Sequence, residues 1–288
     1  MPEMPEVEGL VTFLDARTSG HVVAAVEVGA ISALKTFAPD PAQLAGTTVR
    51  GASRHGKWID LAVADDDTEL HLLVHLARAG WLRWYEQVPA ARLRPGRSPI
   101  ALRLRLDDGS GFDLTEAGTR KRLAVHVVAA PEEVHAVKTL GPEPLGLDAA
   151  GLGAVLRSRN QQVKGALRDQ SVIAGIGNAY SDEILHAART SPFALTGSLD
   201  DEAVARIHTA MEEVLGGAVA AAAGRPAAEL KDAKRSGMRV HGRAGQPCPV
   251  CGDTVREVSF ADSALQYCPT CQTGGKILAD RRMSKLLR

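Results

Sequence analysis

The sequence predicts an α+β protein of several domains: an antiparallel β-sandwich preceded by one helix, then a helical domain, then a C-terminal metal-binding β-hairpin. Three observations predict this arrangement. Short alternating apolar runs with turn signals between them are typical of a β-sandwich. Apolar residues with helical spacing follow residue 146. Four cysteines in two C-x-x-C pairs then lie near the C-terminus, a spacing typical of a metal site.

The N-terminal part, residues 1–135, is predicted to contain one helix and several strands. Apolar residues recur every three or four positions over residues 5–17 and predict an amphipathic helix. The predicted strands cover residues 22–28, 47–52, 58–63, 70–75, 81–85, 100–106 and 123–128. Residues 88–99 are rich in proline, alanine and arginine, and we expect a loop on the sheet edge there.

Residues 136–150 are predicted to be a linker, because glycine and proline recur in their centre. A helical domain is predicted over residues 151–240, and the cysteine module over residues 241–288. The predicted helices cover residues 149–157, 161–170, 179–190 and 200–223. A basic connecting loop is predicted over residues 224–240.

Composition is that of an ordinary globular protein, with 45% hydrophobic and 24% charged residues. No apolar run is long enough for a membrane span and no secretory signal is recognisable, so a cytoplasmic protein is expected. The net charge is zero, but residues 225–288 hold twelve basic and six acidic side chains, against 22 and 28 in residues 1–224. A basic segment is typical of nucleic-acid binding; a solvated charged tail is the alternative.

The cysteine pairs predict one structural zinc ion. Cys248 and Cys251 are followed after sixteen residues by Cys268 and Cys271, the spacing of a four-thiolate zinc site. Four ligands leave no open position for water, so the metal is expected to be structural rather than catalytic. Basic residues flank the module and favour phosphate binding: Arg239, Arg243, Lys276, Arg281, Arg282 and Lys285.

A glycine-rich turn precedes the third predicted helix. Gly175 and Gly177 permit a tight turn, and Asn178 follows at the helix start. Backbone N–H groups at such a helix start can bind a DNA phosphate, although Gly-x-Gly turns are also common packing devices.

Three motifs together resemble the formamidopyrimidine-DNA glycosylase/endonuclease VIII family, and most of all its actinobacterial branch. They are Met1-Pro2-Glu3-Met4-Pro5-Glu6-Val7-Glu8, Gly175-Ile176-Gly177-Asn178 with Asp182-Glu183, and the module from Gly242-Arg243 to Cys271-Gln272. The resemblance implies a helix-two-turn-helix domain and a zinc finger. It also implies a bifunctional DNA glycosylase and abasic-site lyase of base-excision repair, a monomer that acts on damaged double-stranded DNA without an obligate protein partner.

Pro2 is the expected nucleophile once Met1 is removed, because its secondary amine can then form a Schiff base with the sugar and allow β- or β,δ-elimination. The resemblance implies that Glu3 is the general acid. Glu6 lies one helical turn further on and is a second candidate carboxylate. Without the family, an acidic first turn that complements the helix dipole would explain both glutamates.

The remaining site residues are implied by the resemblance. Lys57, in a turn that enters a strand, corresponds to a lysine that holds phosphate and assists catalysis. Expected DNA contacts are His75, Arg78, Arg159, Lys164, Asn178, Arg243 and Ser263.

Several positions depart from the family pattern. Ser263 stands where an arginine normally binds phosphates, so either Arg256 replaces it or the reaction stops more often after β-elimination. Arg78 stands where a methionine fills the gap left by the flipped base, and the usual Arg-Phe pair is not found over residues 113–118. The segment that caps the flipped base is shortened to residues 230–238. The short cap favours oxidised pyrimidines or ring-opened purines over 8-oxoguanine.

Two other functions fit part of the sequence. A catalytically weak or inactive zinc protein that binds lesions or abasic sites would explain Ser263 and the missing wedge residues, but not the combination of Pro2, Glu3 and Lys57. A zinc ribbon for protein contacts would explain the cysteines alone.

Overall fold

The first helix, α1 (Met4–Thr18), extends the helix predicted over residues 5–17 at both ends. Glu3 and Glu6 form a capping box at its start, in which each side chain accepts the backbone N–H of the other residue. This pair of hydrogen bonds satisfies N–H groups that a helix start otherwise leaves without partners. The helix therefore begins at a fixed point, directly after Pro2 and Glu3.

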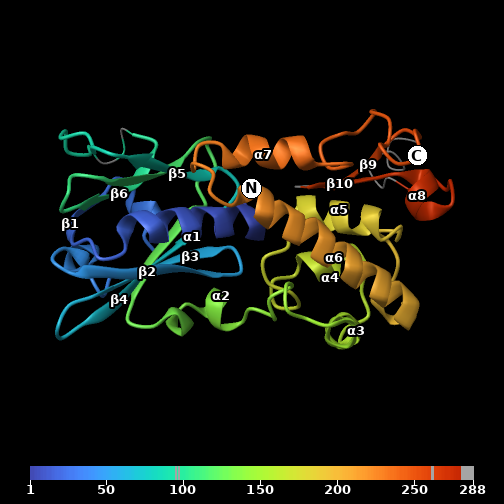
Figure 1. The fold of residues 1–288 in the computed structure, drawn as a ribbon, viewed down its shortest axis with the longest axis horizontal. Coiled ribbons are helices and arrows are strands. Elements are labelled where there is room, and N and C mark those ends of the chain that lie inside the picture. Colours follow the sequence, from blue (N-terminus) through green and yellow to red (C-terminus); the bar gives the residue numbers. More distant parts are fainter. Residues whose placement is uncertain (95, 97, 261–262, 280–288) are drawn as a thin grey trace. The chain divides into compact units, whose positions relative to one another are not determined.

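The computed structural model describes residues 1–94, 96, 98–260 and 263–279, and the predicted antiparallel sandwich is confirmed. Two four-stranded sheets have the strand orders β1-β6-β7-β5 and β2-β3-β4-β8 (Figure 1). The strands are β1 (Val23–Val28), β2 (Thr48–His55), β3 (Trp58–Ala64), β4 (Glu69–His75), β5 (Gly80–Tyr85), β6 (Ile100–Leu106), β7 (Gly111–Glu116) and β8 (Ala124–Val128). One apolar core contains side chains from both sheets and from α1.

Helix α1 contacts both sheets. The Asp15 carboxylate accepts the backbone N–H of Ala52 in β2 at 2.9 Å. On another face of the helix, the Phe13 ring meets the Trp84 ring of β5 edge-on, with 5.7 Å between the ring centroids. The helix is thereby held against the first and the second sheet at once, and its apolar face is removed from water.

Strand β7 was not among the predicted strands, because polar residues interrupt its apolar alternation. Asp113 is fully buried, and the Arg103 guanidinium on β6 binds both of its carboxylate oxygens, at 2.7 and 2.9 Å. The Tyr85 hydroxyl donates a third hydrogen bond to the same carboxylate at 3.0 Å. Breaking a buried pair of this kind typically costs about 3–5 kcal/mol, so the network fixes the pairing of β6 with β7.

The loop predicted over residues 88–99 is held by arginines of β6. Arg103 donates to the carbonyl oxygen of Ala91, and Arg105 donates to that of Val88 at 3.2 Å. Both arginines alternate with core leucines along the strand, so they lie on the side of the sheet that faces away from the core. The loop therefore covers a sheet face rather than only an edge.

The chain divides into two compact units. The first contains Met1–Thr139 and Ala222–Lys231, and the second contains Leu140–Ala221 and Asp232–Arg288. The division at Leu140 falls within the segment predicted as a linker. The later segment of the first unit, Ala222–Lys231, packs with the sandwich, because Leu230 is part of the apolar core of the sandwich.

The second unit is largely helical, as predicted. Within the described ranges, α2 (His135–Lys138) still belongs to the first unit, and the helices after it are α3 (Ala149–Arg157), α4 (Val163–Arg168), α5 (Asn178–Ala187), α6 (Asp201–Ala222), α7 (Leu230–Gly237) and α8 (Pro269–Thr273). Single 3₁₀ turns occur at Ile31–Ala33, Pro41–Leu44, Pro131–Glu133 and Thr196–Ser198. The prediction of a loop over residues 224–240 is wrong for Leu230–Gly237, which form α7. Its charged residues are mostly good helix formers, and the helix starts at a buried leucine.

The cysteine module contains the predicted hairpin. Strands β9 (Arg256–Ser259) and β10 (Ala264–Tyr267) pair antiparallel, and α8 follows directly. Val258, Leu265 and Tyr267 form a small apolar cluster on the hairpin. Such a small core leaves most of the stability of this module to its cysteine site.

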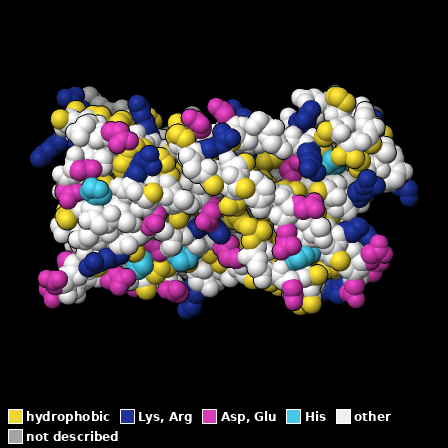
Figure 2. Space-filling view, viewed as in Figure 1, with side chains coloured by type: hydrophobic (Ala, Val, Ile, Leu, Met, Phe, Trp, Pro, Cys, Tyr) yellow, Lys and Arg dark blue, Asp and Glu magenta, His cyan; other side chains and the backbone are white. Residues whose placement is uncertain are grey.

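The distribution of charged side chains on the surface agrees with the net charge of zero. On the face in Figure 2, acidic and basic side chains alternate over the surface without a large region of one sign. Across the described part of the chain, no helix combines the length and the apolar character that crossing a membrane requires.

Candidate functional site

Pro2 and Glu3 are buried immediately before α1. The Glu6 carboxylate accepts the backbone N–H of Glu3 at 2.8 Å, so Glu6 holds the segment that carries Pro2. Glu3 and Glu6 therefore have a structural role at the helix start, a capping box, in addition to the dipole role considered for them. It does not compete with chemistry at Pro2, because it orders the backbone next to the predicted nucleophile.

Lys57 lies in the tight turn between β2 and β3. His55 pairs with Trp58 across this turn, and Gly56 adopts a φ of +56°, which glycine accepts more readily than other residues. The Lys57 side chain is largely buried. The fixed turn therefore gives this lysine a defined position at the start of β3.

Arg54 ties this turn to α1. Its Nε donates to the Glu8 carboxylate at 2.7 Å, and its Nη1 donates to the Gly56 carbonyl oxygen at 2.8 Å. Further along α1, Asp15 binds Ala52 of the same strand. The helix therefore points its N-terminal end toward the turn of Lys57, and both features lie at the same end of the first unit.

Strand pairing brings further predicted residues to this end. Trp58 pairs with His75, and the centroids of their two rings lie 4.9 Å apart. Burial, together with the positive charge of Lys57, lowers the pKa of His75 to about 4. His75 is therefore a neutral imidazole near pH 7, able to donate or accept a hydrogen bond but not to act as a cation.

Two exposed basic turns lie at this end as well. Arg78 lies in the turn between β4 and β5, after Ala77, whose φ of +51° is uncommon for a residue other than glycine. Gly80 pairs with Glu116, which brings the turn between β7 and β8 beside it. That second turn carries three consecutive exposed basic residues, Arg120, Lys121 and Arg122.

The basic turn at residues 120–122 was not among the predicted site residues. Its base is ordered by the buried Glu116, whose carboxylate accepts the backbone N–H groups of Arg122 at 2.7 Å and Leu123 at 3.0 Å. The run of basic residues is visible in the sequence, but its place beside Arg78 follows from strand pairing, of β5 with β7 and of β4 with β8.

The second unit places Lys164 in its interior. The residue is 4% exposed, and its ammonium donates to the Asp182 carboxylate at 2.6 Å, to the Ser181 hydroxyl at 2.9 Å and to the Asn178 carbonyl oxygen at 3.1 Å. Lys164 thus supports the start of α5 from inside, and this geometry gives no support to the direct DNA contact predicted for it.

The glycine-rich turn before α5 is held by one glutamine. Gln170 donates to the Ile176 carbonyl oxygen at 2.8 Å and accepts the N–H of Gly175 at 3.0 Å. Gly175 has a φ of +81°, which explains the glycine at that position. Asn178, the first residue of α5, donates from Nδ2 to the Ala264 carbonyl oxygen of β10 at 2.7 Å. The turn and the hairpin are therefore joined.

Glu183 joins the middle of α5 to the segment before the cysteine module. Its carboxylate accepts three consecutive backbone N–H groups, those of Arg239, Val240 and His241, at 2.8–2.9 Å. Burial raises the pKa of Glu183, while these three hydrogen bonds oppose the rise. The neighbouring Asp182 carboxylate contacts Nδ1 of His241 at 2.8 Å. Helix α5 is thus a support for the module.

The four cysteines gather at one point, as the sequence predicts. The sulfur atoms of Cys248, Cys251, Cys268 and Cys271 all lie within 4.8 Å of one another. Burial raises the pKa of Cys268 to about 11, so four thiolates would not collect here without a cation. Zinc fits this donor set, and the four cysteines form the site of one structural zinc ion.

Other predicted DNA contacts lie on the second unit. Arg159 is exposed after α3. Arg243 is half-buried, and its Nε donates to Gln246 at 3.0 Å. Ser263 is half-buried at the hairpin, and its carbonyl oxygen accepts the N–H of Phe260. Arg256 is exposed on β9. Arg281, Arg282 and Lys285 lie outside the described residues.

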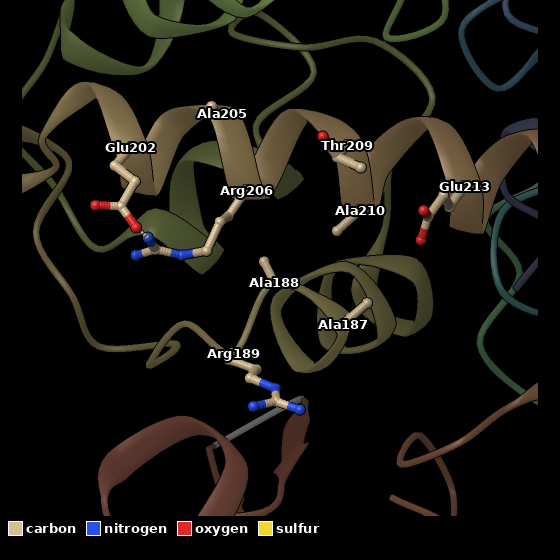
Figure 3. Close-up of a pocket in the computed structure, with 9 residues that line it drawn as sticks. All are labelled: Ala187, Ala188, Arg189, Glu202, Ala205, Arg206, Thr209, Ala210 and Glu213. Atoms are coloured by element: carbon tan, nitrogen blue, oxygen red, sulfur yellow. Dashed lines mark hydrogen bonds and ion pairs between the residues drawn. The ribbon is translucent and has the colours of Figure 1, made fainter.

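A hollow of about 420 Å³ lies in the second unit between the end of α5 and α6 (Figure 3). Its lining is rich in alanine, and the Arg206 guanidinium donates to the Glu202 carboxylate at 2.7 Å. None of the predicted site residues lines it, so it is separate from the sites above.

Three family models cover most of the chain. They are the formamidopyrimidine-DNA glycosylase N-terminal domain (residues 1–125), the formamidopyrimidine-DNA glycosylase H2TH domain (residues 140–228) and the zinc finger found in FPG and IleRS (residues 245–274).

Individual relatives agree with these models. A formamidopyrimidine-DNA glycosylase from Moorella thermoacetica is 35% identical over 272 residues, which cover 90% of this chain and 94% of the relative. An uncharacterized formamidopyrimidine-DNA glycosylase-like protein from Mycobacterium tuberculosis is 58% identical over 151 residues, 52% of this chain and 96% of the relative. The solved complex of the Lactococcus lactis protein with abasic-site DNA has a TM-score of 0.81 at 25% identity, covering 94% of this chain and 99% of that one.

Proposed function

Because the chain belongs to the formamidopyrimidine-DNA glycosylase family, we propose that it is a base-excision repair enzyme that removes oxidised bases from duplex DNA and cleaves the strand at the resulting abasic site. One observation carries the proposal. The folded chain gathers Pro2, Glu3 and Lys57 at the end of the first unit that also presents exposed basic turns. We further propose that the protein is a cytoplasmic monomer that acts on the chromosome.

In the proposed reaction, the amine of Pro2, freed by removal of Met1, attacks C1′ of the damaged nucleotide. The base leaves, and the bond between Pro2 nitrogen and C1′ becomes an iminium ion. Glu3 donates a proton to the sugar ring oxygen as the ring opens. The iminium acidifies the C2′ hydrogen, so its removal expels the 3′ phosphate by β-elimination. Lys57 and the exposed arginines hold the DNA phosphates.

Zinc takes no part in these bond changes. When bound, it supplies a structural cross-link among Cys248, Cys251, Cys268 and Cys271. Asn178 and Arg243 are the proposed phosphate contacts beside the cysteine module, and Arg159 is a further one on the second unit.

The lesion preference is a separate proposal. Residues 230–238, the segment corresponding to the family's lesion cap, include the eight residues of α7. Such a short cap offers few groups to a large flipped purine. We therefore expect oxidised pyrimidines and ring-opened purines to be better substrates than 8-oxoguanine.

Incision of defined duplexes tests the proposed function. The purified chain should cut duplexes with an abasic site, dihydrouracil or thymine glycol faster than a duplex with 8-oxoguanine, and should leave undamaged duplex intact. A Glu3→Gln protein purified in parallel should lose base excision, which shows that the activity is not a contaminant. Tight binding to abasic DNA without any incision would instead identify the catalytically inactive binding protein.

The role of Ser263 can be tested by restoring the family arginine. Ser263→Arg should strengthen abasic-site binding and shift the product from the β-elimination aldehyde toward a gap with phosphate at both ends, because a cation near the lesion holds the phosphates. Ser263→Gln, of similar size but neutral, is the matched control. If the unmodified chain already gives the complete gap and Arg256→Gln abolishes the second elimination, then Arg256 is the substitute.

A further inference from the structure

A buried histidine contacts one of the zinc ligands. His186 lies in the last turn of α5, and its Nε2 is 3.3 Å from Sγ of Cys248. The two residues are only 2% and 3% exposed, and 61 residues separate them in the chain. His186 was not among the predicted site residues, because no local sequence motif joins it to the cysteines.

The chemistry of the sulfur decides which atom is the donor. A zinc-bound cysteine is a thiolate, which has no hydrogen and can only accept. Nε2 of His186 therefore carries the hydrogen, and Nδ1 carries a lone pair. Among the described residues, Nδ1 has no hydrogen-bond partner. The opposite tautomer would bury an unpaired N–H donor and would face the thiolate with a lone pair, so both ring nitrogens favour the same assignment.

The histidine is held in place by the helix that carries it. Glu183, one turn earlier, binds the backbone of Val240 at 2.9 Å, and Val240 packs in the same small core as Cys248 and Cys268. At the first residue of the helix, Asn178 binds β10. In the folded protein the donor therefore has a fixed position, because its helix is attached both to β10 and to the segment before the cysteine module.

We propose that His186 is a positioning residue of the zinc site, which donates a hydrogen bond to the Cys248 thiolate and slows the loss of zinc. The hydrogen bond gives the negatively charged sulfur of the bound ligand a donor in a site that is closed to water. It also fixes the direction in which the sulfur presents its electrons to the ion. Partners of this kind behind metal ligands typically change metal affinity by about tenfold to a hundredfold.

Zinc release from the loaded full-length protein tests the proposal without DNA. An excess of a coloured zinc chelator is added, and the release rate is followed by absorbance. His186→Phe keeps a ring but removes the donor, and should release zinc about ten to a hundred times faster. His186→Gln keeps a side-chain N–H within reach and should release zinc close to the wild-type rate. His208→Gln, which alters a histidine bound to the Leu147 carbonyl, is the control for general destabilisation.

Alkylation supplies a second measurement. In the zinc-loaded His186→Phe protein, mass spectrometry after maleimide treatment should find Cys248 modified earlier than Cys268, whereas the wild type should protect both. Equal release rates for wild type and His186→Phe would overturn the proposal. It would also be overturned if His186→Gln were as fast as His186→Phe, because ring packing would then be the cause. If His186→Phe cannot be loaded at all, loading of His186→Gln supports the donor, and its failure to load contradicts it.

Discussion

A covalent complex with abasic-site DNA should be trapped by borohydride in the wild-type protein and should disappear when the amine of Pro2 is blocked. The reason is chemical: the nitrogen of Pro2 is nucleophilic only as a free secondary amine, and a retained Met1 turns it into an amide without an available lone pair. The test variant is the full-length chain with Pro2→Gly and with Met1 retained. Intact mass verifies that Met1 is present. Trapping is measured by gel mobility, and peptide mapping identifies the linked residue.

The second Pro-Glu pair of the N-terminus supplies the matched control. Pro5 lies inside the first turn of α1, where its nitrogen is part of the peptide chain in every form of the protein. Pro5→Ala should therefore trap as the wild type does. A linkage mapped to Lys57, the buried lysine at the same end of the first unit, would show that a different amine is the nucleophile. That result would contradict the role proposed for Pro2.

The zinc ligands and the first helix could be predicted from the sequence, because each depends on the spacing of residues that are close together in the chain. The C-x-x-C pairs predicted the zinc ligands, and the apolar spacing over residues 5–17 predicted α1. Both depend on neighbours in the sequence. The sandwich was also predictable, because apolar alternation marks most of its strands.

The remaining features depend on contacts between distant residues. Strand β7 was missed because the buried Asp113 breaks the apolar pattern, and its burial is tolerable because Arg103 and Tyr85 on the neighbouring strands donate to it. Lys164 was expected to contact DNA, but its ammonium binds Asp182, eighteen positions later, in the interior of the second unit. The placement of such polar groups is set by partners that no local periodicity reveals.

Removing one zinc ligand should unfold the cysteine module and abolish DNA binding while the sandwich stays folded. Cys268 is the most deeply buried of the four cysteines, and Cys268→Ser leaves the cation with three thiolates and a weaker oxygen ligand. Zinc binding to small finger modules supplies about 10–16 kcal/mol, far more than the cluster of Val258, Leu265 and Tyr267 can replace. Hydrogen exchange should show β9 and β10 unprotected, and binding of the abasic duplex, measured by anisotropy, should be lost.

The sandwich is expected to survive because it has a core of its own, formed by α1 and both sheets. Heating should therefore show that the main unfolding transition is retained in Cys268→Ser, and zinc added back after chelation of the wild type should restore DNA binding. Unchanged affinity in the presence of chelator would contradict the structural role of the metal. Loss of trapping in Cys268→Ser would have a different origin from loss in the blocked Pro2 protein, because the first fails to bind DNA whereas the second binds it without reacting. Measuring binding and trapping on the same abasic duplex therefore separates the contribution of the zinc module from the chemistry at Pro2.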